Sequence, residues 1–225
     1  MFCPEGGVSV RPNKWLALGP KSRADLVVAG RHIATIDEFI GDEARGFFRV
    51  LKEVYEEHEK GGWAWTLLMM NVGVGAGASQ AHLHAQVSSS MEPTRWGPGD
   101  YSREALDKDD RWADNEGLVI SGGRVRVYVA PAPVRTGEIR IRAEEITEMA
   151  DELVVVSRAL SVAFGEVAYN VFFGFTDEEC VARVVPVLGA TGSYALGVGV
   201  EVMPVGTDKV RRAVKAAYES LKRRD

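Results

Sequence analysis

The chain has 225 residues, a formal net charge of -5 and 46% hydrophobic residues, as expected for a soluble globular protein with a sizeable core. The acidic balance argues against a general nucleic-acid-binding surface, so a phosphate site would have to be local. Only two cysteines occur, Cys3 and Cys180, which is too few for a disulfide framework and favours a reducing cytoplasm. The amino terminus lacks a signal-peptide pattern, and no apolar run is long enough to predict a membrane span.

The first 91 residues predict strands around a single long helix. An apolar stripe from Ile40 to Tyr55 has helical spacing. Thr35 and Glu38 have the spacing of a capping box at its start, and a Gly-Gly pair follows its end. The predicted order is strands at 8–11 and 25–29, a helix from about 37 to 59, and strands at 65–71 and 80–88.

The second half repeats this order loosely. Residues 92–116 are rich in Pro, Gly and charge without a clear period, so we expect a connecting loop with at most a short helical turn. The whole pattern predicts an α+β fold, two related halves sharing a largely antiparallel sheet with helices packed outside. Elements expected after the loop are strands at 117–120, 125–130, 138–141, 168–175, 182–188 and 194–203, and helices at 144–164 and 207–221.

The run from Asn71 to Gln86, NVGVGAGASQAHLHAQ, contains the residues best suited to chemistry. If a strand begins near residue 80, His82, His84 and Gln86 lie on one face, where two imidazoles would be costly in a core. The three glycines before them remove side chains from a turn, so backbone N–H groups can form an anion site beside the Ser79 hydroxyl. No helix and no Gly-Lys-Ser/Thr follows, which excludes a dinucleotide fingerprint and a P-loop.

The same run resembles the active-site segment of galactose-1-phosphate uridylyltransferases, a branch of the histidine-triad superfamily. The shared elements occur in order along the chain: Asn71, Gly77-Ala78-Ser79, His82, His84 and Gln86. The flanks are similar too, and the resemblance covers most of the chain. The similar flanking segments are VRPNKWLAL at 10–18, Arg31-His32 with Thr35 and Glu38, and YALGVGVEVMPV at 194–205.

The resemblance implies two histidine-triad-like halves, with the active site in residues 1–91, a connection at 92–116, and a second half at 117–225 without the histidine motif. His84 would attack the α-phosphorus of a nucleotide sugar and become a nucleotidyl-histidine. Gln86 and Ser79 would donate hydrogen bonds to phosphoryl oxygens. Further substrate contacts are implied for Asn13, Lys14, Asn71, Gly77 and Ala78.

The family also implies a zinc ion, no organic cofactor and a homodimer. Cys3, His32 and His82 would supply three protein ligands to the zinc, one fewer than a closed structural site normally has. The strand CVARVVPV at 180–187 lacks the histidines that hold another metal in some members.

The expected reaction is transfer of UMP from a UDP-sugar to a sugar 1-phosphate. A phosphorylase or hydrolase using the same histidine is a first alternative, and a nucleotide-binding protein without turnover is a second. Simpler interpretations exist for single residues: the glycines as a tight hairpin connection, Asn13 as a turn residue, Lys14 as a balance for nearby acids, and His58, among three glutamates, as a solvated surface residue.

Overall fold

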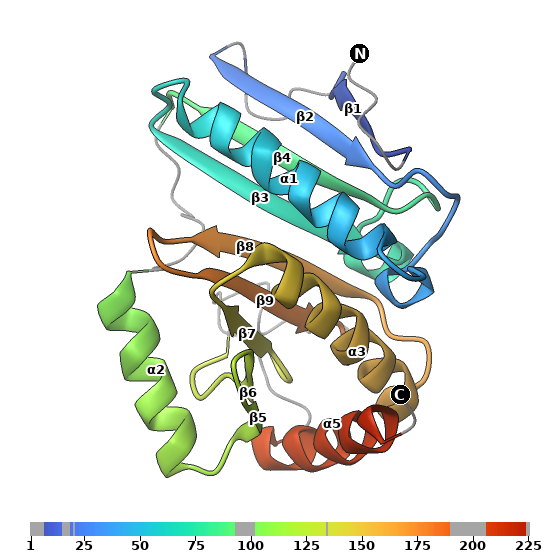
Figure 1. Ribbon diagram of the computed structural model, residues 1–225, viewed down its shortest axis with the longest axis vertical. Helices are drawn as coiled ribbons and strands as arrows, with labels where there is room; N and C mark the ends of the chain where they lie inside the picture. Colours follow the sequence, from blue (N-terminus) through green and yellow to red (C-terminus); the bar gives the residue numbers. More distant parts are fainter. Residues whose placement is uncertain are drawn as a thin grey trace.

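The structure, a computed structural model, describes residues 7–14, 19, 21–92, 102–133, 135–189 and 206–223. In these ranges the chain forms one nine-stranded sheet in which neighbouring strands are antiparallel, with helices outside it, so the predicted α+β class is confirmed (Figure 1). The strands are β1 (Ser9–Pro12), β2 (Ser22–Val28), β3 (Trp65–Val72), β4 (His84–Ser90), β5 (Val119–Gly122), β6 (Arg126–Val129), β7 (Ile139–Ala143), β8 (Tyr169–Phe175) and β9 (Cys180–Pro186). The helices are α1 (Glu43–Glu59), α2 (Arg103–Asn115), α3 (Ile146–Phe164) and α5 (Thr207–Lys222), with 3-10 turns η1 (Ile36–Glu38) and η2 (Val74–Ala76).

The strand order shows an internal duplication. From one edge the sheet runs β1-β2-β4-β3 in the first half and then β8-β9-β7-β6-β5 in the second half. The two halves meet between β3 and β8, and this boundary is called the seam below. In each half a helix, α1 or α3, connects a strand to the one that lies at the seam. The two halves are therefore related by an approximate two-fold axis between β3 and β8. The boundaries at 91/92 and 116/117 stay predictions, since the sheet continues unbroken across the seam.

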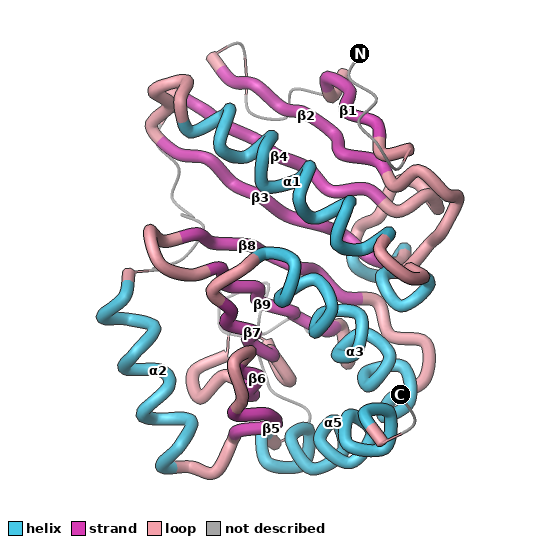
Figure 2. The backbone as a smooth tube through the Cα atoms, in the orientation of Figure 1, coloured by secondary structure: helices cyan, strands magenta, loops and turns pink. Residues whose placement is uncertain are grey.

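One hydrophobic core serves both halves. Helices α1 and α3 lie side by side over the same face of the sheet (Figures 1 and 2). Phe47, Phe48 and Leu51 of α1 are fully buried, and the Phe48 ring lies 5.7 Å from that of Phe173 on β8. Burial of such large side chains is the main stabilising contribution to the fold. The core thereby fixes α1 of the first half relative to β8 of the second.

The opposite face of the sheet is more polar, and strand register arranges its residues in rows. Asn71 pairs with Asn170 across the seam, and His84 immediately precedes Ala85, which pairs with Met70, the residue before Asn71. Paired residues on neighbouring strands point to the same side. His84 and Gln86 therefore face away from α1, on the same side of the sheet as Asn170.

Three predicted boundaries differ from the structure. The Thr35–Glu38 capping box forms but caps the short turn η1, and the chain then turns before α1, leaving Ile40 62% exposed instead of on a buried stripe. The strand expected from residue 80 begins at His84, because residues 79–82 form bends. The expected loop contains the 13-residue helix α2, capped by Ser102. The strand expected at 194–203 lies outside the described residues.

The interpretation of His58 as a surface residue is wrong. Its side chain is 0% exposed, with Nδ1 2.6 Å from the Ser89 hydroxyl and Nε2 3.0 Å from the Asp25 carboxylate. The last turn of α1 lies over the sheet, which turns this one position inward between exposed glutamates. Asp25, His58 and Ser89 have the composition of a catalytic triad, but Ser89 is fully buried and also bonded to Thr66, so the cluster is structural.

Candidate active site

His84 is held in one tautomer by its own backbone. It is the first residue of β4, is 4% exposed, and places Nδ1 2.9 Å from the His82 carbonyl. A carbonyl only accepts, so Nδ1 carries a proton, and in the neutral imidazole the lone pair is therefore on Nε2. Within the described part of the chain, Nε2 has no hydrogen-bond partner. His84 thus has the form that nucleophilic attack requires.

His82 lies before the strand and is held differently. Its Nε2 donates to the Ala29 carbonyl at 2.7 Å and approaches that of Arg31 at 3.2 Å. The expectation that His82 shares a strand face with His84 and Gln86 is therefore wrong, because β4 starts two residues later. Only His84 and Gln86 project together from β4.

The glycine-rich segment folds into the turn η2 next to these residues. Gly73 and Gly77 have φ of +81° and +88°, a backbone region that residues with a Cβ rarely adopt. The N–H groups of Ala76, Gly77 and Ala78 donate back to carbonyls at the start of the turn. Contrary to expectation, these N–H groups do not point outward as anion donors.

Backbone donors are instead found just after the turn. Among the described residues, the N–H groups of residues 79–82 have no backbone hydrogen-bond partner. Ser79 is exposed at the start of this run. A run of N–H groups beside a hydroxyl can bind an anion. The expected phosphate contacts of Ser79 fit this arrangement, whereas Gly77 and Ala78 shape the turn.

Asn71 is joined to a residue that sequence analysis missed. The Asn170 amide donates to the Asn71 side-chain oxygen and to the Ala76 carbonyl, each at 2.8 Å. Asn71 in turn lies 3.4 Å from the Gly77 carbonyl through its own amide nitrogen. The one sequence signal for Asn170 is an amide side chain in the otherwise apolar strand YNVFFGF.

Asn13 and Lys14 lie at the edge of the first half. The Asn13 N–H donates to the Ala24 carbonyl at 2.8 Å, two strands away from β4. The register puts the Asn13 side chain on the His84 face of the sheet. Lys14 follows in a bend and is exposed. Their nucleotide contacts stay predictions.

Two of the three predicted zinc ligands lie close together. The rings of His32 and His82 are 4.8 Å apart at their centroids, at an interplanar angle of 71°. Because His82 donates through Nε2 to a carbonyl, its Nδ1 is left as the ligand atom, a usual arrangement around bound metals. Cys3 lies outside the described residues, and within them no group of three or more His, Cys, Asp or Glu side chains could hold a metal. The histidine pair fits half of a zinc site.

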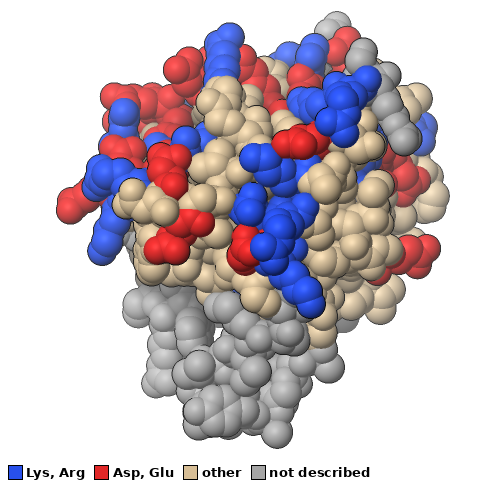
Figure 3. Space-filling view, turned by 90° about the horizontal axis from the view of Figure 1, so that it is seen from below, with Lys and Arg blue, Asp and Glu red and all other residues tan. Residues whose placement is uncertain are grey.

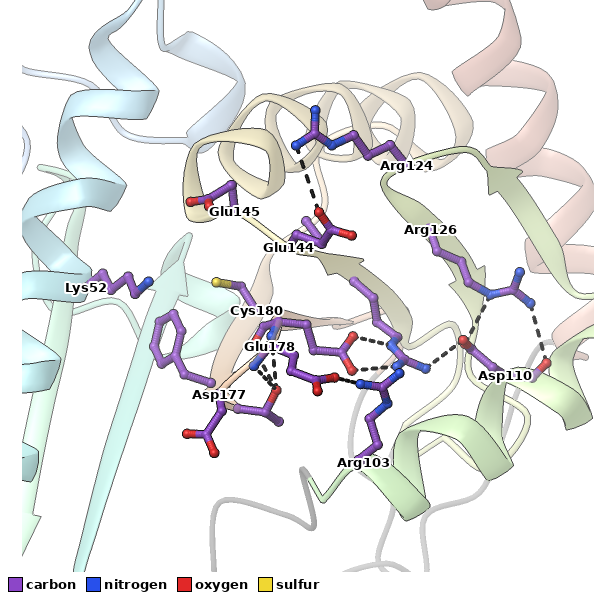
Figure 4. Close-up of a pocket in the computed structure, with 15 residues that line it drawn as sticks. Lys52, Arg103, Asp110, Arg124, Arg126, Glu144, Glu145, Asp177, Glu178 and Cys180 are labelled. Carbon is purple, nitrogen blue, oxygen red and sulfur yellow. Dashed lines mark hydrogen bonds and ion pairs between the residues drawn. The ribbon is translucent and has the colours of Figure 1, made fainter.

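A large cavity lies elsewhere, at the far end of β8 from Asn170. It measures about 700 Å³ and is lined mainly by arginines and carboxylates of α2 and the second half, with Lys52 of α1 at one side (Figure 4). Carboxylates already pair these cations: Arg142 contacts Glu179 and Asp110, each at 2.6 Å. Seen from the second-half end, acidic and basic side chains are interspersed (Figure 3). The cavity is therefore a poor site for a phosphate despite its size.

Solved structures share this fold at low sequence identity. A uridylyltransferase structure matches with a TM-score of 0.75 and 15% identity over 95% of this chain and 85% of that chain. A DUF4931 family protein from Bacillus cereus matches at 0.72 and 17%, covering 96% and 97%. An ADP-glucose phosphorylase from Arabidopsis thaliana with bound ADP-glucose matches at 0.73 and 14%, covering 92% and 81%.

No family model and no curated protein matches the sequence. No helix among the described residues is long and apolar enough to cross a membrane. At identities this low the matches establish architecture and leave the reaction open. The chain has the fold of the uridylyltransferase-like proteins, which confirms at the level of fold the resemblance found in its sequence.

Proposed function

We propose that this chain is a nucleotidyltransferase that moves UMP from a UDP-sugar to a sugar 1-phosphate through a nucleotidyl-His84 intermediate. The observation that carries the proposal is the bond from His84 Nδ1 to the His82 carbonyl. It leaves the Nε2 lone pair on the polar face of β4, beside Gln86 and the glycine-rich turn. The uridylyltransferase fold supports the same reaction class.

In the first step, His84 Nε2 would attack the α-phosphorus. The new N–P bond forms while the bond from phosphorus to the bridging oxygen breaks, and the sugar 1-phosphate leaves with the electron pair. The imidazole then carries a positive charge, which the His82 carbonyl stabilises through Nδ1–H. In the second step, a phosphate oxygen of the acceptor attacks phosphorus and the His84 lone pair is restored.

Gln86 and Ser79 would stabilise the charge on the non-bridging phosphoryl oxygens. A carboxamide donates a hydrogen bond without transferring a proton, so Gln86 favours the transition state without activating water. The N–H groups of residues 79–82, for which no described residue supplies a backbone acceptor, would add backbone donors. Asn13 and Lys14, which follow β1 directly, would contact the nucleotide from two strands away.

The predicted zinc would be held by His32, His82 and Cys3, and when bound it would tie the segment before η1 to the segment before β4. It would be structural, since His82 does not share the face of β4 with His84. The resemblance further implies a homodimer, which sedimentation analysis of the full chain can test.

A phosphorylase is the second candidate. The fold is shared with an ADP-glucose phosphorylase, and the His84 intermediate would be the same. Only the acceptor differs: inorganic phosphate would attack the nucleotidyl-histidine in place of a sugar phosphate. The geometry of β4 serves both reactions equally.

Intact-protein mass spectrometry tests the shared intermediate. Wild type, His84→Ala, Gln86→Ala and the control Asn115→Ala, at the exposed end of α2, would be incubated with UDP-glucose or ADP-glucose without acceptor. We expect a nucleotidyl adduct on wild type and Asn115→Ala, none on His84→Ala, and adduct formation about 10²–10³-fold slower on Gln86→Ala.

The isolated adduct would then be mixed with galactose 1-phosphate, inorganic phosphate or buffer alone. Release of UDP-galactose supports transfer to a sugar phosphate, whereas release of a nucleoside diphosphate with phosphate identifies a phosphorylase. If folded wild-type protein binds these nucleotide sugars tightly and forms no adduct, the protein is a binding protein and the proposal is wrong.

A further inference from the structure

Asn170 lies in the half of the chain without histidines, yet it contacts the turn beside His84. We infer that Asn170 is a positioning residue of the second half that holds the glycine-rich turn in place for the reaction. The positioning of the turn stands on the geometry alone, while its consequence for chemistry rests on the proposed function. Asn170 acts through the turn and touches no reacting atom.

The hydrogen bonds fix the orientation of both amides. The Ala76 carbonyl only accepts, so the Asn170 atom 2.8 Å away from it is the amide nitrogen. The second hydrogen of that nitrogen goes to the Asn71 side-chain oxygen, also at 2.8 Å. The Asn71 nitrogen then faces the Gly77 carbonyl at 3.4 Å. Asn170 therefore reaches the turn both directly and through Asn71.

A second contact from the same strand end supports this role. A Cβ built on Gly73 or on Gly75 would meet the Ala168 side chain at 3.1 Å, tighter than ordinary contact. The backbone of the turn thus packs directly against the residue two before Asn170. Packing from Ala168 and hydrogen bonds from Asn170 leave the turn little freedom to move away from β8.

The position of this pair at the seam explains why the second half matters to the site. Asn71 and Asn170 are directly opposite each other on β3 and β8, where the two halves meet. The turn continues into Ser79 and the N–H groups of residues 79–82, which have no backbone partner in the described part of the chain. A displacement of about 1 Å in such groups can lower a reaction rate about 10²-fold.

Three variants test the inference in the full chain: Asn170→Ala, Asn71→Ala and the double variant, with Asn115→Ala as the control. The rate of adduct formation and the UDP-glucose concentration for half-maximal rate would be measured, together with Tm. We expect Asn170→Ala to lower the rate about 10-fold or more with only a small change in Tm. The double variant should be no slower than the slower single variant, since the two amides act as a unit.

Hydrogen exchange of the amides at 76–78 gives a readout that needs no catalysis. Exchange there should be faster in Asn170→Ala than in wild type and unchanged in Asn115→Ala. Faster exchange without any wild-type adduct would support the positioning of the turn while the proposed function fails. Unchanged exchange, kinetics within two-fold of wild type, or rate losses that multiply in the double variant would each overturn the inference.

Discussion

The strands β4 and β9 occupy equivalent places in the two halves, yet their polar faces are built for different purposes. On β4, His84 and Gln86 face a surface where, within the described residues, His84 Nε2 has no partner. On β9, Arg183 lies on the same side of the sheet and donates to the Glu138 carboxylate at 2.8 Å. One half leaves reactive atoms available, while the other half satisfies its charges internally.

The closed face of the second half is a compact ion-pair cluster. Glu138 is 0% exposed and accepts from Arg183 and, at 3.1 Å, from Arg140. Arg140 also pairs with Asp109 on α2. Both halves of the duplicated fold therefore have a polar sheet face. In the first half this face carries the candidate reactive residues, and in the second half its ion pairs hold α2. Asn170 links the two halves physically, because it belongs to the second half and contacts the glycine-rich turn of the first.

The largest expected effect on stability comes from opening the closed face. Glu138→Ala leaves two largely buried guanidinium groups without a shared carboxylate, and it should lower the free energy of unfolding by about 3–5 kcal/mol. Urea denaturation followed by tryptophan fluorescence measures the change. Glu144→Ala, at a side chain 73% exposed, is the matched control and should stay within about 0.5 kcal/mol of wild type. Equal effects of the two variants would refute the distinction between the halves.

The two buried histidines of the first half, His58 and His84, should differ in whether their loss affects stability or chemistry, and the expected loss of stability is smaller than that for Glu138→Ala. His58→Ala removes the partner of both Asp25 and Ser89, so it should cost about 2–4 kcal/mol of unfolding free energy while the rate of adduct formation stays near that of wild type. His84→Ala should abolish the adduct and cost no more than about 1 kcal/mol. Both quantities are measured on both variants. Loss of the adduct in folded His58→Ala would show that the buried cluster also serves the chemistry.

The sequence predicted the parts of the fold that have strong periodicity. The helices expected at 144–164 and 207–221 occur as α3 and α5, within two residues at each end. Helix α2 was missed because Leu106 and Ala113 are its only residues classed as buried, which leaves almost no apolar stripe to detect. The motif also placed His84 and Gln86 on one strand face.

The missed features depend on contacts between distant segments. His58 has three glutamates as close neighbours in sequence, but its burial is decided by β2 and β4, which lie over 25 residues away on either side. The role of Asn170 in holding the turn depends on its hydrogen bond to Asn71, 99 positions earlier in the chain. The inward N–H groups of η2 depend on the φ angles of Gly73 and Gly77. The sequence shows only the amide in an apolar strand and the glycines themselves, and neither predicts which contacts they make.

The smallest predicted effect concerns the pH dependence of the buried cluster. Burial alone would raise the pKa of Asp25, but hydrogen bonds from His58 and Arg23 outweigh it, so the pKa lies below its ordinary value. The ionised carboxylate therefore contributes stability that is fully present above the unfolded-state pKa, about 3.9, and is lost as pH falls through the lower folded value. Asp25→Asn removes this contribution.

Urea denaturation between pH 7 and pH 3 tests this assignment. Asp25→Asn should be less stable than wild type at pH 7, and the two unfolding free energies should converge below about pH 4 as the wild-type carboxylate is protonated. Asp42→Asn, at a side chain 88% exposed, should follow the wild-type curve. A constant difference between wild type and Asp25→Asn across this range would mean that the Asp25 charge is unimportant. The first half would then be held under α1 by packing and neutral hydrogen bonds, in contrast to the ion pairs of the second half.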